Sequence, residues 1–484
     1  MLFTSLAFFV FLPLTLAVFA AIAPHRRWLV LLLASWLFYG AAKPANLLYL
    51  GGITLVVLGC ASLMARSQSD AGRRALLAIG LCLVLGSLVG FKFYDFAAGE
   101  IERWMNGGVT LPRLGLMAPA GYSFYAFSAA SVLIESCRGQ GDNAPRAGAL
   151  ALYLAYFPKI LAGPIERSTR FLPQLGAGLR ANPEQVVLGL QLVLWGLVKK
   201  VVIADNLAPL VDKAFGIARF ATPVELLASV YFFAFQIYCD FSGYTDIAIG
   251  VSLLFGLQLM ENFRRPYLAR STSEFWARRW HISLGTWFRD YLYLPLGGSR
   301  AGRVRHYLNL MLVFLASGLW HAGLGYGVGW TFLVWGALNG AYQWAGVASG
   351  PGWRRLGERF PRVAGSTAWA SLRVLLTFHL IAIAWVFFRA KSIDEATLIL
   401  TKIGRSLGDL PSLLMHYPFS GDQMLGAALI ALLIAIELVD ERRSIFARLA
   451  AAPAALRWGV WYLALAALLL LGRWQSREFI YMQF

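Results

Sequence analysis

His321 is the residue whose type and surroundings are best suited to chemistry. It lies in the stretch SGLWHA at 317–322, at least fifteen residues from the nearest formal charge. An ionisable side chain inside so apolar a run indicates a functional position in a membrane protein. Removal from water favours the neutral imidazole, which is the form that a general base needs. A structural histidine that hydrogen-bonds between helices is the alternative interpretation.

A second histidine, His281, lies in a segment that is both basic and aromatic. Residues 264–305 contain nine arginines against two acidic residues, a net charge of +7. If residues 273–293 form one helix, its apolar residues recur at spacings of three and four and share one face. Those residues are Trp276, Trp280, Leu284, Trp287 and Tyr291. Glu274 and Arg278 would then form a favourable pair about one turn apart.

This segment has two interpretations. Tryptophans beside arginines are typical of a helix that lies in the membrane interface or re-enters the protein. The simpler interpretation is a cytoplasmic anchoring helix. The more specific interpretation is that the arginines line an entrance for an anionic ligand, such as a nucleotide-bearing acyl donor. The candidate contacts for such a ligand are Arg278, Arg279, Trp280, Arg289 and Asp290.

Two carboxylates, Asp240 and Asp246, lie near the junction of two apolar runs. Being six residues apart, they would not share a face of one straight helix. Gly243 between them predicts a break, and the short polar residues around it suit a helix cap. A structural polar turn is therefore the expected role, with a contribution to a site as the alternative.

The composition predicts that a membrane bundle positions these residues. Of 484 residues, 58% are apolar and 14% are charged, whereas a soluble chain averages roughly 45–50% and about 25%. These values exclude a soluble globular domain, a disordered chain and a disulfide-stapled secreted domain. We expect an all-α polytopic protein of roughly 10–13 helices of about 20 residues each.

The net charge of +18 is concentrated in short connections between apolar runs. Basic connections mark the cytoplasmic side of a membrane protein, so they indicate orientation and not nucleic-acid binding. The first 24 residues contain no Asp, Glu, Lys or Arg, which predicts an uncleaved first helix with an outside N-terminus. A signal peptide is the alternative. The four cysteines show no CxxC spacing and are expected to pack as small apolar residues.

The order of several short stretches resembles the membrane-bound O-acyltransferase family, and most of all its bacterial alginate-acetylating branch. The resemblance covers most of the chain. The stretches are FPKILAGPI at 157–165, DFSGYTDIAIG at 240–250, ENFRRPY at 261–267, EFWARRWHISLGTWFRDYLYLPLGG at 274–298, GLWH at 318–321 and FIYMQF at 479–484. The first of them also predicts a helix interrupted by Pro158 and Gly163.

The resemblance implies one membrane domain over residues 1–484, with a tunnel in which a histidine meets the acyl donor and the acceptor from opposite sides. It places that histidine at His321, with Trp320 beside it, and a second characteristic histidine at His281. Related proteins often carry a histidine where this chain has Asn339, so neither the role of that position nor its acceptor-side specificity carries over from them. Asn339 is a candidate substrate or tunnel residue. Neither a metal nor a tightly bound cofactor is implied.

From these residues we expect a membrane O-acyltransferase, and specifically an O-acetyltransferase, in which His321 deprotonates an acceptor hydroxyl. The donor would be cytoplasmic acetyl-CoA or another acyl thioester. The resemblance further implies that the acceptor is a periplasmic acetyltransferase-type partner in a complex that synthesises or modifies a polysaccharide. The protein would lie among the lipids of the bacterial inner membrane and bind no nucleic acid. The alternatives are an acyl or glycan transporter, for which no internal repeat is visible, and a non-catalytic scaffold.

Overall fold

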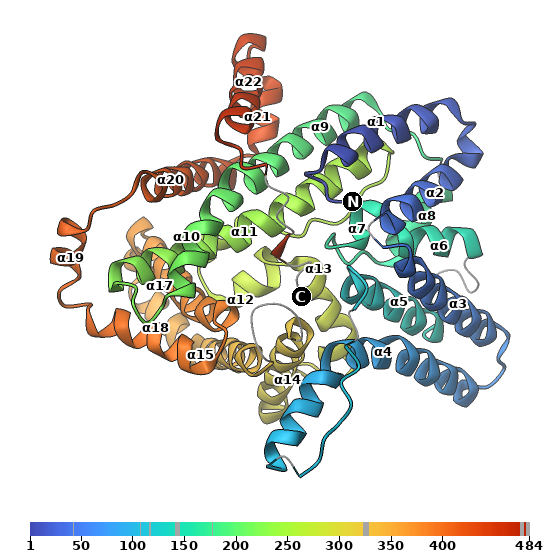
Figure 1. Ribbon diagram of the computed structural model, residues 1–484, viewed down its shortest axis with the longest axis horizontal. Helices are drawn as coiled ribbons and strands as arrows, with labels where there is room; N and C mark the ends of the chain where they lie inside the picture. Colours follow the sequence, from blue (N-terminus) through green and yellow to red (C-terminus); the bar gives the residue numbers. More distant parts are fainter. Residues whose placement is uncertain are drawn as a thin grey trace. The chain divides into compact units, whose positions relative to one another are not determined.

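The computed structural model describes residues 1–41, 43–106, 108–115, 118–140, 146–176, 178–322, 329–474 and 479–480. Within these ranges all regular structure is helical, and no strand occurs (Figure 1). The prediction of an all-α protein is confirmed. The chain divides into two compact units, whereas the prediction of one family domain over the whole length stays a prediction.

Unit 1 contains Met1–Gly196, Tyr244–Glu261 and residues 479–480. Its longest helices, α3, α4 and α5, pack against one another. The helices of this unit are α1 (Leu6–Ala21), η1 (Pro24–Arg26), α2 (Arg27–Gly40), α3 (Ala45–Arg66), α4 (Asp70–Trp104), α5 (Tyr122–Cys137), α6 (Ala147–Ala155), α7 (Phe157–Ile160), α8 (Ser168–Gly176) and α9 (Pro183–Leu197).

The predicted interruption by proline and glycine is present in unit 1. α6 ends at Ala155, α7 covers only four residues, and the chain then leaves the helical conformation. The freed backbone groups find partners, because the Phe157 amide donates to the Ser35 hydroxyl over 3.0 Å and the Gly163 amide to the Lys159 carbonyl over 3.0 Å. A broken helix is stable inside a membrane protein only under this condition.

Unit 2 contains Leu197–Gly243 and Asn262–Trp474. Its central pair is α14 and α15, which lie side by side (Figure 1). Its elements are η2 (Val198–Ala204), α10 (Asp205–Gly216), η3 (Pro266–Leu268), α12 (Thr272–Glu274), η4 (Phe275–Arg279), α13 (Ile282–Phe288), η5 (Arg289–Tyr293), α14 (Arg303–His321), α15 (Trp330–Arg359), α16 (Pro361–Ala364), α17 (Thr367–Arg389), α18 (Ile393–Arg405), α19 (Leu410–His416), α20 (Gly421–Arg442), α21 (Ile445–Ala451) and α22 (Ala454–Leu471).

The predicted break at Gly243 is wrong. Helix α11 (Pro223–Leu254) continues through this residue, with its first part assigned to unit 2 and its last part to unit 1. A glycine inside a helix costs only about 1 kcal/mol relative to alanine. The neighbouring side chains of Phe241 and Tyr244 are buried, and burying two aromatic side chains outweighs that cost.

The single helix expected over residues 273–293 is also wrong. The chain forms α12 and the π-helical turn η4, turns at Trp280 and His281, and resumes as α13 and η5. His281 has a φ of 44°, in the left-handed region that ends a right-handed helix. The turn is held from outside, because the Arg264 amide donates to the Arg279 carbonyl over 2.8 Å and the Ile282 amide to the Asn262 carbonyl over 2.9 Å.

Seven helical stretches in the described ranges are long and apolar enough to cross a membrane. The shorter helix α1 is apolar as well. The seven stretches are Ala45–Arg66, Asp70–Trp104, Pro183–Gly216, Pro223–Leu254, Thr367–Arg389, Gly421–Arg442 and Ala454–Leu471. The charge-free run of residues 306–353 is long enough for two spans, and its glycines predict a turn near residues 323–329. Apart from Gly329, this turn lies outside the described residues, and so do residues 481–484 of the terminal motif.

Candidate active site

A cavity of about 230 Å³ in unit 2 brings the two predicted histidines together. His281 and His321 both line it, although 40 residues separate them in the chain. The walls come from the segment between α12 and η5 on one side and from α14 and α15 on the other. The lining residues include Trp276, Trp280, Leu284, Arg289, Tyr293, Leu310, Ser317 and Gln343.

His321 ends α14 and is only 3% exposed. Its ring makes edge-to-face contacts with Trp335 (5.3 Å between centroids, 84°) and Phe388 (5.3 Å, 69°). The adjacent Trp320 ring lies 4.6 Å away at 81°. Such contacts restrict the rotation of an imidazole without occupying its nitrogen lone pairs. The ring is therefore held in one orientation at the edge of the cavity.

His281 occupies the turn before α13 and is 2% exposed. Its ring contacts Phe241 at 4.7 Å and Trp320 at 5.9 Å, so Trp320 touches both histidines. Burial lowers the pKa of His281 to about 3, because an apolar environment disfavours the charged imidazolium. His281 is thus neutral at physiological pH.

Asn262, which sequence reasoning did not single out, holds the turn that carries His281. It is fully buried, and its side-chain oxygen accepts hydrogen bonds from the Ser283 amide (3.2 Å) and the Ser283 hydroxyl (2.8 Å). These bonds satisfy a donor at the start of α13. The signal available in the sequence was the position of Asn262 within the motif ENFRRPY.

The cavity follows one face of α14. Leu310, Val313, Phe314, Ser317 and His321 line it, and their spacings of three and four are those of a single helix face. At about 1.5 Å per residue, Leu310 and His321 lie about 16 Å apart along the helix axis. The residues around His321 are buried, whereas Arg289, which lines the same cavity, has a side chain that is 60% exposed. The cavity, which we call the channel, therefore extends from an exposed end at Arg289, its mouth, to a buried end at His321.

Glycines allow α14 and α15 to approach closely beside His321. A Cβ at Gly318 would lie 2.5 Å from the Phe332 carbonyl oxygen, and one at Gly336 would lie 2.5 Å from the Phe314 carbonyl oxygen. Neither distance is compatible with a side chain. Small residues at such contacts are typical of membrane helices, whose association depends on close packing.

Asn339 does not itself line the channel. It is fully buried, its amide donates to the Trp335 carbonyl over 2.8 Å, and its oxygen accepts a hydrogen bond from the Trp276 indole over 3.0 Å. Trp276 forms part of the wall. Asn339, predicted as a substrate or tunnel residue, therefore positions Trp276 of the channel wall, and its direct contact with a substrate stays a prediction.

The predicted arginines divide into two groups. Arg279 is nearly buried and pairs with Glu274 and Glu441, each over 2.7 Å. The two ion pairs outweigh the effect of burial and raise the pKa of Arg279. The expected pair of Glu274 with Arg278 is wrong, because the π-helical turn brings residues five apart together. Arg278 is exposed and does not line the channel.

Arg289 lines the mouth and pairs with Asp290 over 2.8 Å. Nearby, the Tyr293 hydroxyl and His306 share a hydrogen bond of 2.8 Å, which attaches η5 to the first turn of α14. Arg300, Arg303 and Arg305 lie at or just before this turn. The mouth of the channel is therefore the basic end of α14, whereas His321 is at its other end.

The two predicted carboxylates do not meet at a site. Asp240 is buried and forms an ion pair with Lys200 over 2.6 Å, and Lys200 also pairs with Asp205 over 3.0 Å. Buried charges inside membrane helices require such partners. Asp246 is partly buried and belongs to the part of α11 assigned to unit 1. Asp240 therefore has structural contacts, but the polar turn expected around it does not form, because α11 is continuous through this stretch.

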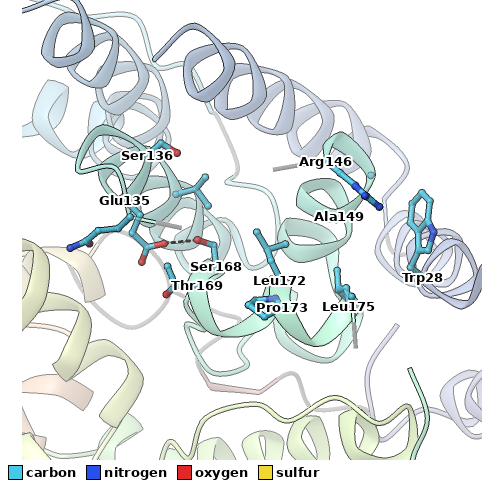
Figure 2. Close-up of a pocket in the computed structure, with 14 residues that line it drawn as sticks. Trp28, Glu135, Ser136, Arg146, Ala149, Ser168, Thr169, Leu172, Pro173 and Leu175 are labelled. Carbon is cyan, nitrogen blue, oxygen red and sulfur yellow. Dashed lines mark hydrogen bonds between the residues drawn. The ribbon is translucent and has the colours of Figure 1, made fainter. Parts of the chain in front are cut away.

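A larger cavity of about 880 Å³ lies in unit 1. Figure 2 shows the Glu135 carboxylate accepting a hydrogen bond from Ser168 on one side, with Arg146 and Trp28 on the other. A Cβ at Gly148 would lie 2.5 Å from the Trp28 ring, so glycine leaves room for this wall. None of the predicted catalytic or ligand-binding residues lines this cavity. The channel of unit 2 is accordingly the candidate active site.

Comparison with protein families adds an independent finding. A sequence model of MBOAT, the membrane-bound O-acyltransferase family, matches residues 114–385. This range covers more than half of the chain. It includes α11, the segment from Asn262 to Tyr293, α14 and α15.

Individual proteins are similar over most of the chain. A probable alginate O-acetylase, AlgI, of Pseudomonas aeruginosa is 36% identical over 402 residues, which cover 82% of this chain and 73% of that protein. A peptidoglycan O-acetyltransferase of Helicobacter pylori is 33% identical over 431 residues, covering 82% of this chain and 78% of its own. A teichoic acid D-alanyltransferase of Bacillus subtilis is 24% identical over 290 residues, covering 58% and 71%.

Proposed function

The chain belongs to the membrane-bound O-acyltransferase family and is a multi-pass membrane acyltransferase, and we propose that it transfers an acetyl group from a cytoplasmic thioester to a hydroxyl acceptor, with His321 as the general base. The observation that carries this proposal is the channel of unit 2, which is lined by two buried histidines. Two of the similar proteins are named for O-acetyl transfer, one to alginate and one to peptidoglycan.

In the proposed reaction, neutral His321 takes the proton of the acceptor hydroxyl as its oxygen attacks the thioester carbonyl. The new C–O bond forms, the C–S bond breaks, and the departing sulfur receives the proton from the imidazolium. A positioned base of this kind typically contributes ~10²–10⁴-fold to the rate. The walls of the channel would contribute further, because they hold the thioester in line with the acceptor.

The donor is proposed to enter at the mouth beside Arg289. This arginine is exposed and lies near the basic start of α14, and basic connections favour the cytoplasmic side. A guanidinium at the mouth suits the phosphates of acetyl-CoA or of a related thioester. The acceptor is proposed to approach from the other side of the membrane, through a periplasmic partner that passes the acetyl group to a polysaccharide.

Replacement of His321 tests the proposal. We expect His321→Ala to insert normally and to lower acetyl transfer by ~10²–10⁴-fold, measured as the O-acetyl content of the cell's glycans in a complemented deletion strain. His379→Ala is the matched control. His379 is an exposed histidine on α17 that bonds Tyr231 and its own helix backbone, and its loss should leave acetylation unchanged.

Two outcomes would contradict the proposal. Full acetylation in the His321→Ala strain would exclude His321 as the base and would agree with a scaffold. Loss of glycan acetylation without loss of thioester turnover in purified protein would indicate a transport step in place of chemistry.

A further inference from the structure

Gln343 is a buried polar residue of the channel that neither the sequence motifs nor the proposed base chemistry uses. It lies on α15, lines the channel and is only 6% exposed. Its side-chain nitrogen has no hydrogen-bond partner among the described residues. A buried amide without a partner costs roughly 1–3 kcal/mol. Such a group inside a cavity therefore indicates that a ligand completes its hydrogen bonding.

Gln343 lies toward the mouth of the channel and not beside the base. The α14–α15 pair is antiparallel, since Gly318 faces Phe332, Gly336 faces Phe314 and Gly340 faces Met311. Continuing this register places Gln343 level with the first turns of α14, nearly four helical turns from His321. The Trp344 indole donates to the Tyr307 carbonyl over 2.6 Å, which confirms the register and fixes the orientation of this part of α15.

The lining of the channel restricts what Gln343 can bind. The channel has a volume of about 230 Å³ and extends over about 16 Å of α14. The walls between the two ends are apolar and aromatic, with Trp276, Leu284, Val313 and Phe314 among them. A ligand that reaches His321 from the mouth must therefore lie along apolar walls and place a polar group level with Gln343.

We infer that Gln343 is a positioning residue that recognises an amide in the arm of the acyl thioester donor. A carboxamide offers one donor face and one acceptor face, so it is complementary to a secondary amide, which has an N–H and a C=O. An arm that carries amides and ends in a thioester is common to coenzyme A and to acyl carrier proteins. Arg289 at the mouth would face the phosphate of either one.

This inference rests on the proposed function and makes a separate prediction. The purified full-length protein is assayed for acetyl transfer from S-acetyl-pantetheine and from an oligo-ether thioacetate of equal length that lacks amides. In Gln343→Leu we expect the KM for S-acetyl-pantetheine to rise about 3- to 10-fold, as for one lost hydrogen bond. kcat and all parameters for the ether donor should stay at their wild-type values. Gln343→Asn keeps a carboxamide, so its KM for S-acetyl-pantetheine should fall between the values of the wild type and Gln343→Leu.

Ser349→Ala is the matched control on the same helix. The Ser349 hydroxyl is exposed and bonds the Ala345 carbonyl within α15. Its removal should therefore leave KM and kcat unchanged for both donors. Parallel assays of the wild type with acetyl-CoA and with an acetylated carrier protein distinguish the two natural sources of the arm, since only the true source should support rapid acetyl transfer.

Equal losses with the amide-bearing donor and the ether donor would overturn the inference, because Gln343 would then have only a structural role. A wild-type protein that transfers acetyl groups from no thioester would contradict the proposed function itself. The two failures are thus distinguishable in one set of assays.

Discussion

Aromatic rings surround both histidines of the channel, and Trp320 contacts each of them. The backbone orients the two histidines in different ways. His321 ends a regular helix, so its direction follows from α14. His281 has a φ of 44° in a turn that Asn262 supports. A non-glycine residue in the left-handed region is uncommon and costs roughly 1–2 kcal/mol. The turn adopts this unfavourable conformation at His281, and it thereby places the His281 side chain at the channel.

Acid should destabilise the protein through His281. Its pKa is about 3 in the folded protein and about 6.5 in an unfolded chain. Between these values only the unfolded chain binds the proton, so stability is fully present above pH 6.5 and falls as the pH falls below it. At pH 5 the loss is on the order of 2 kcal/mol. Denaturant unfolding in detergent at pH 7.5 and pH 5 measures it.

His281→Gln provides the comparison for this prediction. Glutamine has no proton to gain, so the difference in unfolding free energy between the two pH values should shrink by about the same 2 kcal/mol. Identical acid sensitivity in the variant and the wild type would show that His281 is not the group responsible.

At the scale of elements, the position of His321 depends on how closely α14 and α15 approach. Gly318 precedes His321 by three residues on α14 and lies against the backbone of α15. Both helices lie on the same side of the channel, where α14 forms most of the wall and α15 contributes Gln343. A change in their separation therefore moves the base relative to Gln343 and to the opposite wall.

Gly318→Ala should impair catalysis without touching a catalytic group. The added methyl would meet the Phe332 carbonyl oxygen at 2.5 Å, so the helices must separate. Overpacking of this kind typically costs about 1–3 kcal/mol. We expect a lower thermal midpoint and a lower kcat for acetyl transfer.

Gly346→Ala is the control at this scale. Gly346 lies on α15, and a Cβ there would meet no atom within 4 Å. Alanine is favoured over glycine in a helix, so this variant should be as stable as the wild type or slightly more stable. A Gly318→Ala protein that matched Gly346→Ala in kcat would contradict the importance of close packing.

At the scale of the whole molecule, the net charge of +18 lies mainly in short connections. The stretch from Arg66 to Arg74 and the pair Arg26–Arg27 are examples. The cytoplasmic side of a membrane retains such connections. Taken with the charge-free first helix, this distribution predicts that the N-terminus lies outside.

Cysteine labelling tests this orientation. In a Cys82→Ala background, which removes an exposed native thiol, a membrane-impermeant maleimide should label Thr4→Cys in intact inner-membrane preparations. It should label Gln68→Cys, between α3 and α4, only after the membrane is opened. The reverse pattern would contradict the predicted orientation.

Composition and motif order alone predicted the helical membrane class, the acyltransferase family and the two histidines, because these depend on local sequence. The apolar excess requires a membrane, and the motifs GLWH and WHISL carry His321 and His281 whatever their surroundings. The sequence also contained an unused signal for Gln343, a second amide four residues after Asn339, on the same helix face.

Only the tertiary structure decided which residues share a site. Arg279 was predicted to contact a ligand but pairs with Glu441, 162 residues away, and Asp240 pairs with Lys200. Gln343, in contrast, joins His321 along one channel. Helix periodicity could not predict these partners. The π-helical turn η4 and the left-handed residue His281 change the direction in which the side chains that follow them point. Which charge is neutralised and which polar group is left for a ligand depends on contacts between distant segments, and these form only when the helices pack.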